Sequence, residues 1–382
     1  MNLPTSDGLR LNKMSSKPSS LADYVVLSEE AFHKTISIER KRTERSRKPF
    51  LLMLLDTAKA SLLDQQSVLS KLSSTLQLST RETDVTGWYK YNAIIGVMFT
   101  EIGSEDRTAI VSTMITRVST TLRDNLSFEE FNQISISFYL FPEDWDPKIP
   151  QRSAHPTLYP DLAKRDNARK HFCIAKRLMD VVGSASALLM LAPLFLLIAA
   201  AIKLTSKGPV FYRQQRIGRH GVPFVFLKFR SMFLNSDSGV HESYVRDLIA
   251  GCAERKPHNG NGPGVFKLTE DSRITPLGSI LRRTSLDELP QFWNVLRGDM
   301  SLVGPRPPIP YEVEAYDIWH RRRLLEAKPG ITGLWQVNGR SRVAFDEMVR
   351  LDLRYARTWS PWLDLKILLR TPWAVVIGEG AH

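Results

Sequence analysis

The chain has 382 residues, of which 43% are hydrophobic, and its 52 Lys and Arg against 40 Asp and Glu give a formal charge of +12. This length and apolar content suit two or three folded domains and exclude a wholly disordered chain. Two cysteines are too few for a disulfide scaffold or a cysteine-rich zinc module. The basic excess indicates an anionic partner, and composition leaves nucleic acid, a membrane surface and a phosphorylated substrate all open.

The first part of the chain predicts a leader and a small domain. Residues 1–22 are rich in Ser, Lys and Pro and are typical of a disordered leader without a signal peptide. Residues 23–147 alternate strand and helix patterns, beginning with the apolar run Phe50–Asp56, which predicts a buried strand. Helices are expected up to Leu78 and over Asp106–Asp124, and strands near Gly87–Tyr91, Ala93–Phe99 and Gln133–Leu140, with Asn92 in a turn. Residues 148–172 show little periodicity and are interpreted as the linker to a second domain over 173–382.

The segment Val181–Ile202 contains 22 residues without a charge. As a straight helix it would be ~33 Å long, against a hydrocarbon core of about 30 Å, so its length alone favours a transmembrane helix. However, Pro193 near the middle bends a helix, and both flanks are basic, which leaves no obvious outer end. These features favour a re-entrant helix over about 178–204 that bends at Pro193 and returns to the same membrane face. The spanning helix remains the alternative, because backbone groups at the midplane must still be satisfied.

Two adjacent acids, Asp287 and Glu288, are the first candidates for chemistry. They lie in a segment that begins at Ser285, beside Arg282 and Arg283. One carboxylate could attack a phosphorus atom while the other holds a divalent cation. The structural alternative is a helix capping box between Ser285 and Glu288.

Several other residues have both a functional and a structural interpretation. Arg306 in a Pro-bounded loop, and Arg340 at the end of a turn-rich run from residue 328, suit phosphate contacts, or else are solvated side chains of surface turns. Asp352 and Asp364 are each either a ligand or an ion-pair partner, and the ion pair is the commoner role of such a residue. The run 321–323 of three arginines predicts a solvated helix face, and 257–264, rich in Gly, Asn and Pro, predicts a loop.

The C-terminal segment Trp359–Ile377 sets Trp residues among aliphatic ones. It predicts an amphipathic helix at a membrane interface, with a core helix as the alternative.

The second half of the chain resembles the bacterial sugar transferase family, the monotopic polyprenyl-phosphate phosphoglycosyl transferases. The resemblance runs from about Lys176 to His382 and rests on long motifs in one order. These are KRLMD at 176–180, the Pro-centred apolar run, KGPVFYRQQRIG at 207–218, KFRSM at 228–232, SLDELPQFWNVLRGDMSLVGPRP at 285–307, KPGITGLWQVNGR at 328–340 and WLDLKILL at 362–369.

The resemblance implies transfer of a sugar phosphate from a UDP-sugar to a polyprenyl (undecaprenyl) phosphate, with release of UMP, at the start of exopolysaccharide, capsule or other glycoconjugate synthesis. It implies that Asp287 is the nucleophile that forms a covalent phosphosugar intermediate and that Glu288 is a ligand of Mg²⁺. It further implies phosphate or nucleotide contacts from Arg282, Arg306 and Arg340. Lys176, Arg177, Asp180 and Pro193 would belong to the membrane helix, with the two basic residues at lipid headgroups and Pro193 at the kink. The expected location is the cytoplasmic face of the bacterial inner membrane.

The N-terminal half faintly resembles the fold of diguanylate cyclase domains. The similar stretches are ERKRTERSRKPFLLMLLD at 39–56, RETD at 81–84 and ISISFYLFPED at 134–144. The family's Gly-Gly-Asp/Glu-Glu-Phe turn is missing, and Tyr89–Ala93 stands about where it would fall, so we expect neither cyclase activity nor metal binding there. The domain is instead expected to regulate the enzyme or to form a homodimer.

The sequence therefore predicts a degenerate, cyclase-like α/β N-terminal domain and a mainly helical α+β, membrane-associated catalytic domain with one re-entrant, Pro-kinked helix. The alternative function is an inactive membrane-bound protein that regulates or assembles polysaccharide synthesis. Nucleic acid is not an expected partner, because the basic residues flank an apolar run and no nucleic-acid-binding motif is present.

Overall fold

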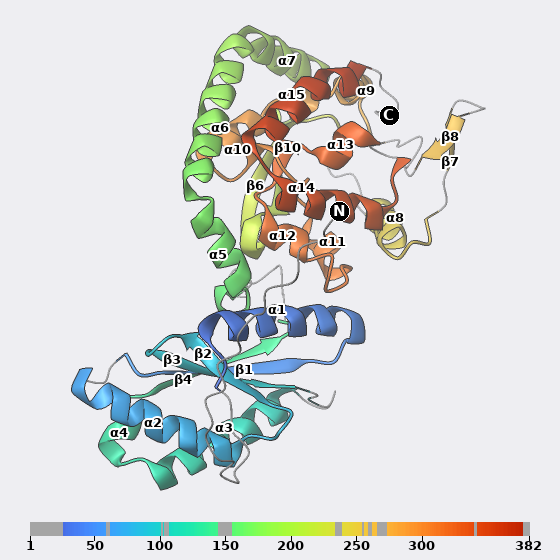
Figure 1. Cartoon of the computed structure of the whole chain (residues 1–382). Helices are drawn as coiled ribbons and strands as arrows, with labels where there is room; N and C mark the ends of the chain where they lie inside the picture. The colour runs from blue at the N-terminus through green and yellow to red at the C-terminus, as the bar shows by residue number, and fades with distance from the viewer. Residues whose placement is uncertain are drawn as a thin grey trace, which may run out of the picture.

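The computed structural model describes residues 26–58, 62–100, 102, 107–143, 155–233, 239–253, 256–258, 262–265, 273–339 and 342–376. A small N-terminal domain lies below a larger, mostly helical one in Figure 1, and α5 leads from the first into the second. The expected leader at residues 1–22 lies outside the described residues.

The N-terminal domain is built on a four-stranded antiparallel sheet with the strand order β2-β3-β1-β4. Its strands are β1 (Phe50–Asp56), β2 (Val85–Lys90), β3 (Ile94–Phe99) and β4 (Ser135–Phe141). Its helices are α1 (Glu29–Ser46), α2 (Leu62–Ser79), α3 (Arg107–Asn125) and the short α4 (Phe128–Asn132). These elements confirm the predicted mixed α/β pattern, and Asn92 takes a positive φ of 54° in the turn between β2 and β3.

Strand β1 forms the centre of the N-terminal core because both of its faces are covered. Leu51 and Met53 pack with residues of α2 and α3, whereas Leu52 and Leu54 pack with Phe32 of α1. A strand buried on both faces needs apolar residues at every position, which explains its continuous apolar sequence.

The segment interpreted as a linker is largely helical. The 3₁₀ turn η1 (Pro156–Leu158) and the helix α5 (Pro160–Ala168) follow residues 144–154, which lie outside the described part of the chain. Asp161 of α5 pairs with Arg40 of α1 and accepts a hydrogen bond from Ser37. Partners 121 and 124 residues away along the chain therefore hold α5 in place. Its own sequence is short and polar and carries no apolar periodicity that would predict the helix.

The second domain is mainly helical, as predicted. Its helices are α6 (Lys170–Met190), α7 (Ala192–Thr205), α8 (Gly239–Ile249), α9 (Pro276–Arg283), α10 (Gln291–Arg297), α11 (Pro310–Glu314), α12 (Arg322–Glu326), α13 (Leu334–Asn338), α14 (Phe345–Thr358) and α15 (Pro361–Val376). Among the described residues its strands form three pairs: antiparallel β5 (Phe211–Ile217) with β6 (Pro223–Phe229), antiparallel β7 (Lys256–His258) with β8 (Gly262–Val265), and parallel β9 (Ser301–Val303) with β10 (Gly330–Thr332). The segment 257–264, predicted to be a loop, thus contributes to a hairpin, because its backbone pairs despite the glycines.

The apolar run of the second domain forms two helices that meet at a bend. Helix α6 ends at Met190, α7 begins at Ala192, and the pair is bent by 60°. Pro193 lies in the first turn of α7, where its missing N–H leaves no helical hydrogen bond unmade, so the predicted break at this residue is confirmed. Among the described residues no single helix is long and apolar enough to cross a bilayer, whereas the bent pair together meets the length and composition that a crossing requires.

Candidate active site

The two adjacent acids lie in a tight turn between α9 and α10. Leu286–Glu288 form one 3₁₀ turn, and Pro290 precedes the first residue of α10. Ser285 takes a positive φ of 58°, and its side chain makes no capping hydrogen bond, so the alternative of a capping box is not what the structure contains. The turn places the side chain of Asp287 in the interior, 8% exposed, and that of Glu288 nearer the surface, 29% exposed.

Lys228 of β6 contacts both acids. Its Nζ lies 2.8 Å from Oε1 of Glu288 and 3.5 Å from Oδ2 of Asp287. The lysine comes from a strand 60 residues earlier in the chain, so it is absent from the site residues predicted from the sequence. The sequence signal for it is that Lys228 opens the KFRSM stretch, on a strand that pairs with β5.

The environment separates the pKa values of the two acids. Burial and the neighbouring Glu288 raise the pKa of Asp287, although Lys228 and Arg282 act against the rise. Burial also acts to raise the pKa of Glu288, but Lys228, Arg306 and Arg216 outweigh it and lower that pKa to about 2. Glu288 is therefore the fixed anion of the pair and Asp287 the more basic carboxylate, which suits a nucleophile.

Arginines from three separate elements surround the acids. Arg282 is on α9, Arg306 is exposed in the loop after β9, and Arg216 of β5 is buried, donating from Nη1 to the carbonyl of Pro307 at 2.8 Å. Burial and the charge of Arg306 lower the pKa of Arg216 to about 10. Burial and four arginines, among them these three, lower the pKa of His241 to about 4, which places His241 in the same basic cluster. A strongly positive, partly enclosed site of this kind suits phosphate groups.

The loop that carries Arg306 is fixed through its backbone. Gly304 and Gly330 bring β9 and β10 so close that a Cβ on Gly304 would lie 2.2 Å from the carbonyl oxygen of Lys328. Arg216 binds the carbonyl of Pro307, and Arg323 donates to the carbonyl of Arg306 at 3.1 Å. The loop is therefore held through its backbone carbonyls, while the side chain of Arg306 is exposed and its charge acts to lower the pKa of Glu288.

The basic residues just before the apolar run contact protein rather than solvent. Lys176 forms a 2.6 Å ion pair with the fully buried Asp364 and also donates to the carbonyl of Val303. Arg177 donates to the last carbonyls of α10, at Val295 and Leu296. Acceptors on elements far along the chain thus bind both side chains, and their expected place at lipid headgroups stays a prediction.

The remaining acids expected on this segment or as ligands have structural partners. Asp180 is buried and accepts hydrogen bonds from Ser301 Oγ and the N–H of Leu302, both at 2.9 Å. Asp352 lies 2.7 Å from Arg323, so it and Asp364 are ion-pair partners and take no part in the cluster around Lys228. Burial raises the pKa of Asp352 to about 6, although Arg323 acts to lower it.

The three consecutive arginines do not form a solvated face. Arg323 is 5% exposed and Arg322 is 21% exposed, and both bind carboxylates. The prediction was wrong because their partners are up to 278 residues away in the chain. Arg340, another predicted phosphate ligand, lies outside the described residues.

The chain belongs to the bacterial sugar transferase family, whose model matches residues 171–378, more than half of its length. It is 45% identical over 209 residues to "Galactosyl transferase CpsE" of Streptococcus agalactiae, which covers 54% of this chain and 43% of that protein. It is 41% identical over 212 residues to "Exopolysaccharide production protein ExoY" of Rhizobium meliloti, which covers 55% of this chain and 88% of that protein. A third relative, 41% identical over 221 residues, is "UDP-glucose:undecaprenyl-phosphate glucose-1-phosphate transferase" of Caulobacter vibrioides, with 55% of this chain and 72% of that protein covered.

The matches do not extend over whole proteins in every case. The chain spans less than half the length of CpsE, and 44% of "Undecaprenyl-phosphate galactose phosphotransferase" of Salmonella typhimurium. A solved "DGC protein from Thermotoga maritima" matches at a TM-score of 0.27 and 17% identity, covering 32% of this chain and 86% of that one. A likeness at this level carries no argument, so the cyclase-like character of the N-terminal domain stays a prediction.

Proposed function

We propose that this protein transfers a sugar 1-phosphate from a UDP-sugar to a polyprenyl phosphate such as undecaprenyl phosphate, releasing UMP, and so begins an exopolysaccharide or related glycoconjugate. The observation that carries the proposal is the buried Asp287, made more basic than Glu288 and surrounded by Lys228 and arginines. Membership of the sugar transferase family and the names of its relatives supply the substrate classes.

The reaction proceeds in two displacements at one phosphorus atom. A carboxylate oxygen of Asp287 attacks the phosphorus that carries the sugar, and the bond from that phosphorus to the oxygen bridging to UMP breaks. An oxygen of the polyprenyl phosphate then attacks the same phosphorus, and the acyl phosphate bond breaks to free Asp287. Lys228 and the arginines stabilise the negative charge on the phosphate oxygens during both steps. A covalent intermediate lets the soluble and the lipid substrate react one after the other.

The site also fits Mg²⁺ through the chemistry of its oxygen donors. Within the described ranges no group of three or more His, Cys, Asp or Glu side chains could hold a metal. Mg²⁺ does not need such a group, because it commonly binds one or two carboxylates together with substrate phosphates and waters. Glu288, ionised and partly exposed, would hold the ion, with Asp287 adjacent. A bound Mg²⁺ would supply positive charge to the diphosphate of the donor.

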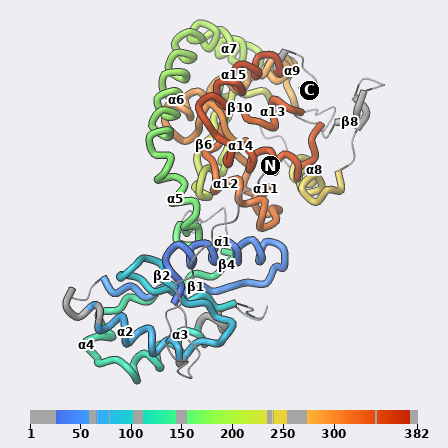
Figure 2. The backbone as a smooth tube through the Cα atoms, in the orientation of Figure 1, coloured from blue at the N-terminus to red at the C-terminus, as the bar shows by residue number. Residues whose placement is uncertain are grey.

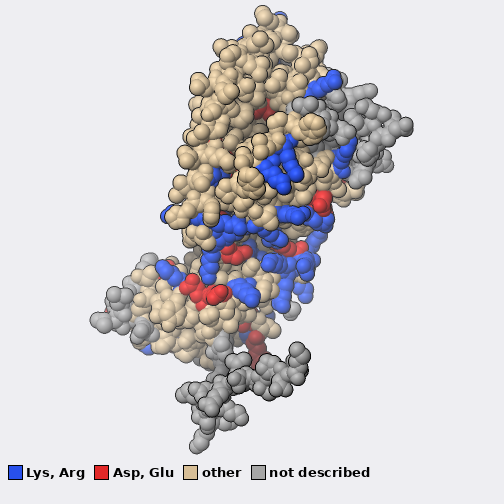
Figure 3. Space-filling model, turned by 45° about the horizontal axis from the view of Figure 1, so that its top comes forward, with Lys and Arg blue, Asp and Glu red and all other residues tan. Residues whose placement is uncertain are grey.

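The bent helix pair is proposed to enter one leaflet at the cytoplasmic face of the inner membrane and return. Its apolar side chains are open to the surroundings, as Leu189 and Leu197 show at 79% and 66% exposure, and Trp362 and Trp373 of α15 are 71% and 70% exposed. Figure 3 shows the upper part of the molecule almost without charge and Lys and Arg gathered below it. An uncharged end bordered by basic residues suits insertion into an anionic membrane surface.

Release of UMP from a panel of UDP-sugars tests the function. The full-length protein in vesicles would receive Mg²⁺, undecaprenyl phosphate and one donor at a time, beside the variants Asp287→Asn and, as a matched control, Asp346→Asn on α14, where the side chain is 51% exposed. We expect release with one or a few donors, lost in the first variant and kept in the second. A folded, membrane-bound protein that releases no UMP from any donor would favour the alternative, an inactive regulatory or assembly protein.

A further inference from the structure

The two domains share one hydrophobic cluster, and α12 belongs to it. Leu325 of α12 is 2% exposed and packs in the same cluster as Phe32 and Ile36 of α1, with the partly buried Ile318 beside it. Figures 1 and 2 show α1 at the junction, directly below the second domain. Helix α12 has only five residues. Because so short a helix is not stable alone, its position depends on what surrounds it.

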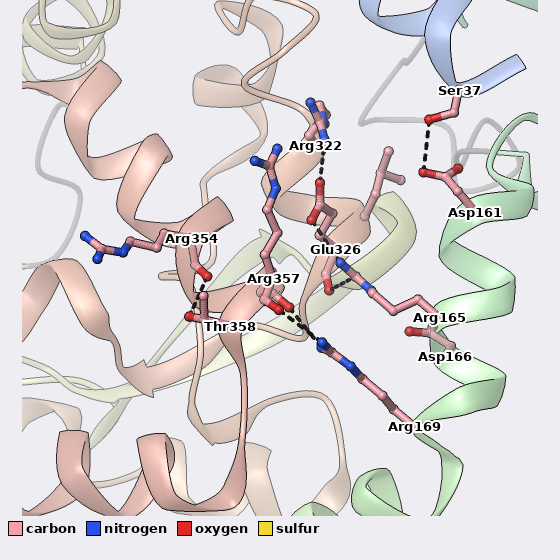
Figure 4. A network of polar contacts seen from close by, with 12 residues as sticks. Ser37, Asp161, Arg165, Asp166, Arg169, Arg322, Glu326, Arg354, Arg357 and Thr358 are labelled. Atoms are coloured by element: carbon pink, nitrogen blue, oxygen red, sulfur yellow. Dashed lines mark hydrogen bonds and ion pairs between the residues drawn. The ribbon is translucent and has the colours of Figure 1, made fainter. Parts of the chain in front are cut away.

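Arg322 is the charged link between α12 and the N-terminal domain. Its guanidinium contacts Glu44 of α1 at 3.4 Å and Glu326, one turn further along α12, at 2.9 Å. Arg165 of α5 binds the carboxylate of the same Glu326 at 3.1 Å and its carbonyl at 3.0 Å. Figure 4 shows Arg165, Arg322 and Glu326 together. The carboxylates of Glu44 and Glu326 are only 11% and 3% exposed, so solvent screens this network less than a surface pair.

The next residue of α12 reaches the active site. Arg323 binds Asp352 of α14 at 2.7 Å and donates to the carbonyl of Arg306 at 3.1 Å. Pro307 of the same loop accepts a 2.8 Å hydrogen bond from Arg216. Arg216 and Lys228, the lysine that contacts both acids, lie against the same aromatic ring, that of Phe226, at 5.1 and 5.6 Å from its centroid. Adjacent residues of one helical turn therefore connect the N-terminal domain to the loop beside the two acids.

We propose that the N-terminal domain positions the Arg306 loop through α12, with Glu44 and Arg322 acting as positioning residues for the active site. Contact with Glu44 holds Arg322 and the first turn of α12, and that turn sets where Arg323 meets the backbone of the loop. When the contact between Glu44 and Arg322 is lost, α12 and residues 304–309 become more mobile. Arg306 then spends less time in contact with the phosphate of the donor substrate. The catalytic consequence rests on the transferase function proposed above, whereas the positional part does not.

Hydrogen exchange tests the positional part without any substrate. In full-length Glu44→Gln we expect faster amide exchange in peptides covering 301–309 and 322–326 than in the wild type. The matched control is Arg47→Gln, which removes another ion pair between the domains, with Asp317 at 3.2 Å, where the Arg47 side chain is 76% exposed. Exchange at α12 should stay as in the wild type in this control. Unchanged exchange in Glu44→Gln would overturn the proposal whether or not the protein is active.

Kinetics test the consequence for the active site. Glu44→Gln should lower kcat/KM for the donor about fivefold, the low end of couplings between sites, mainly through a higher KM. Because Glu44 acts through Arg322, kcat/KM of the double variant Glu44→Gln, Arg322→Gln should be no lower than that of Arg322→Gln alone. If the two substitutions acted independently, their fold-losses in kcat/KM would multiply. If the wild type transfers sugar phosphate and Glu44→Gln has unchanged kinetics, the proposed positioning role is wrong. If the wild type is inactive with every donor, the function proposal fails and the exchange result alone decides the positional part.

Discussion

Lys228 and Glu288 form a 2.8 Å ion pair that joins β6 to the turn before α10. Their contact makes Glu288 the anchored anion of the acidic pair and leaves Asp287 the more basic member. Asymmetry of this kind assigns different roles to two neighbouring carboxylates.

Lys228→Gln is expected to lower kcat/KM about tenfold to a hundredfold. The loss corresponds to about 1.5–3 kcal/mol for a hydrogen bond that involves charged groups. Steady-state rates of UMP release measure it, and Lys228→Arg should recover part of the activity because it keeps the charge. Equal rates for Lys228→Gln and the wild type would show that the pair plays no part in the reaction.

The raised pKa of Asp287 predicts an acid limit to the rate. Protonated Asp287 cannot attack, so kcat/KM should fall as the pH drops through its folded-state pKa, at a higher pH than the value of about 3.9 for a free Asp. Since Lys228 acts to lower that pKa, Lys228→Gln should move the acid limb to higher pH. A pH profile of kcat/KM between pH 4 and about pH 9 checks both statements. A limb that moves to lower pH in the variant would contradict the assigned charges.

Lys176→Met is expected to destabilise the second domain by about 3–5 kcal/mol, because it leaves the carboxylate of Asp364 buried and uncompensated. Asp364 is fully buried and would keep Tyr355 and Trp359 as hydrogen-bond donors, at 2.7 and 2.9 Å. The apparent melting temperature in detergent measures the effect, with Lys34→Met, at an exposed position of α1, as the control. A double variant with Asp364→Leu should melt at a higher temperature than Lys176→Met alone, and the reverse order would speak against this cause.

Cysteine labelling distinguishes a re-entrant pair from a broken spanning helix. Cys173 at the start of α6 is exposed, and Ser206→Cys places a thiol at the end of α7. One protein keeps only the thiol of Cys173 and the other, with Cys173→Ser, keeps only the thiol at position 206. Both carry Cys252→Ser. In right-side-out and inverted membrane vesicles, an impermeant thiol reagent should label both positions from the cytoplasmic side only. Labelling of the two positions from opposite sides would identify a spanning pair.

The apolar surface itself is also testable. Leu196 and Leu197 of α7 are 73% and 66% exposed, and an Arg at either position should weaken binding to anionic vesicles, by about 2.5 kcal/mol or more if the residue lies near the bilayer centre. Ile115→Arg on α3, where the side chain is 38% exposed, is the control in the N-terminal domain. Co-sedimentation with vesicles measures the difference. Equal binding by the Leu197→Arg and Ile115→Arg variants would exclude α7 as the inserted element.

Local sequence patterns predicted the elements whose signal is local. The uninterrupted apolar run of β1 and the proline that separates α6 from α7 can each be recognised from a few neighbouring residues. Pairings between distant residues were not predictable in this way. Lys176 meets Asp364 across 188 positions, and Arg322 meets Glu44 across 278, so the residues around them carry no sign of the partner.

The acidic pair was found because it stands in a long motif, whereas its partner Lys228 was missed. A lysine on an exposed-looking strand is commonly a solvated residue, and only the pairing of β5 with β6 and the packing of β6 against the turn at Glu288 bring it into the site. Chain topology, rather than residue type, therefore decides which cation of the sequence contacts the two acids.

The most direct test of the account is whether labelled UMP enters the UDP-sugar when no polyprenyl phosphate is present. If Asp287 takes the sugar phosphate and releases UMP before the acceptor binds, that step is reversible, and label should appear in the donor in the wild type and in Asp346→Asn but not in Asp287→Asn. If label enters the donor only when the acceptor is added, or enters it equally in Asp287→Asn, Asp287 is not the nucleophile of a separate first step.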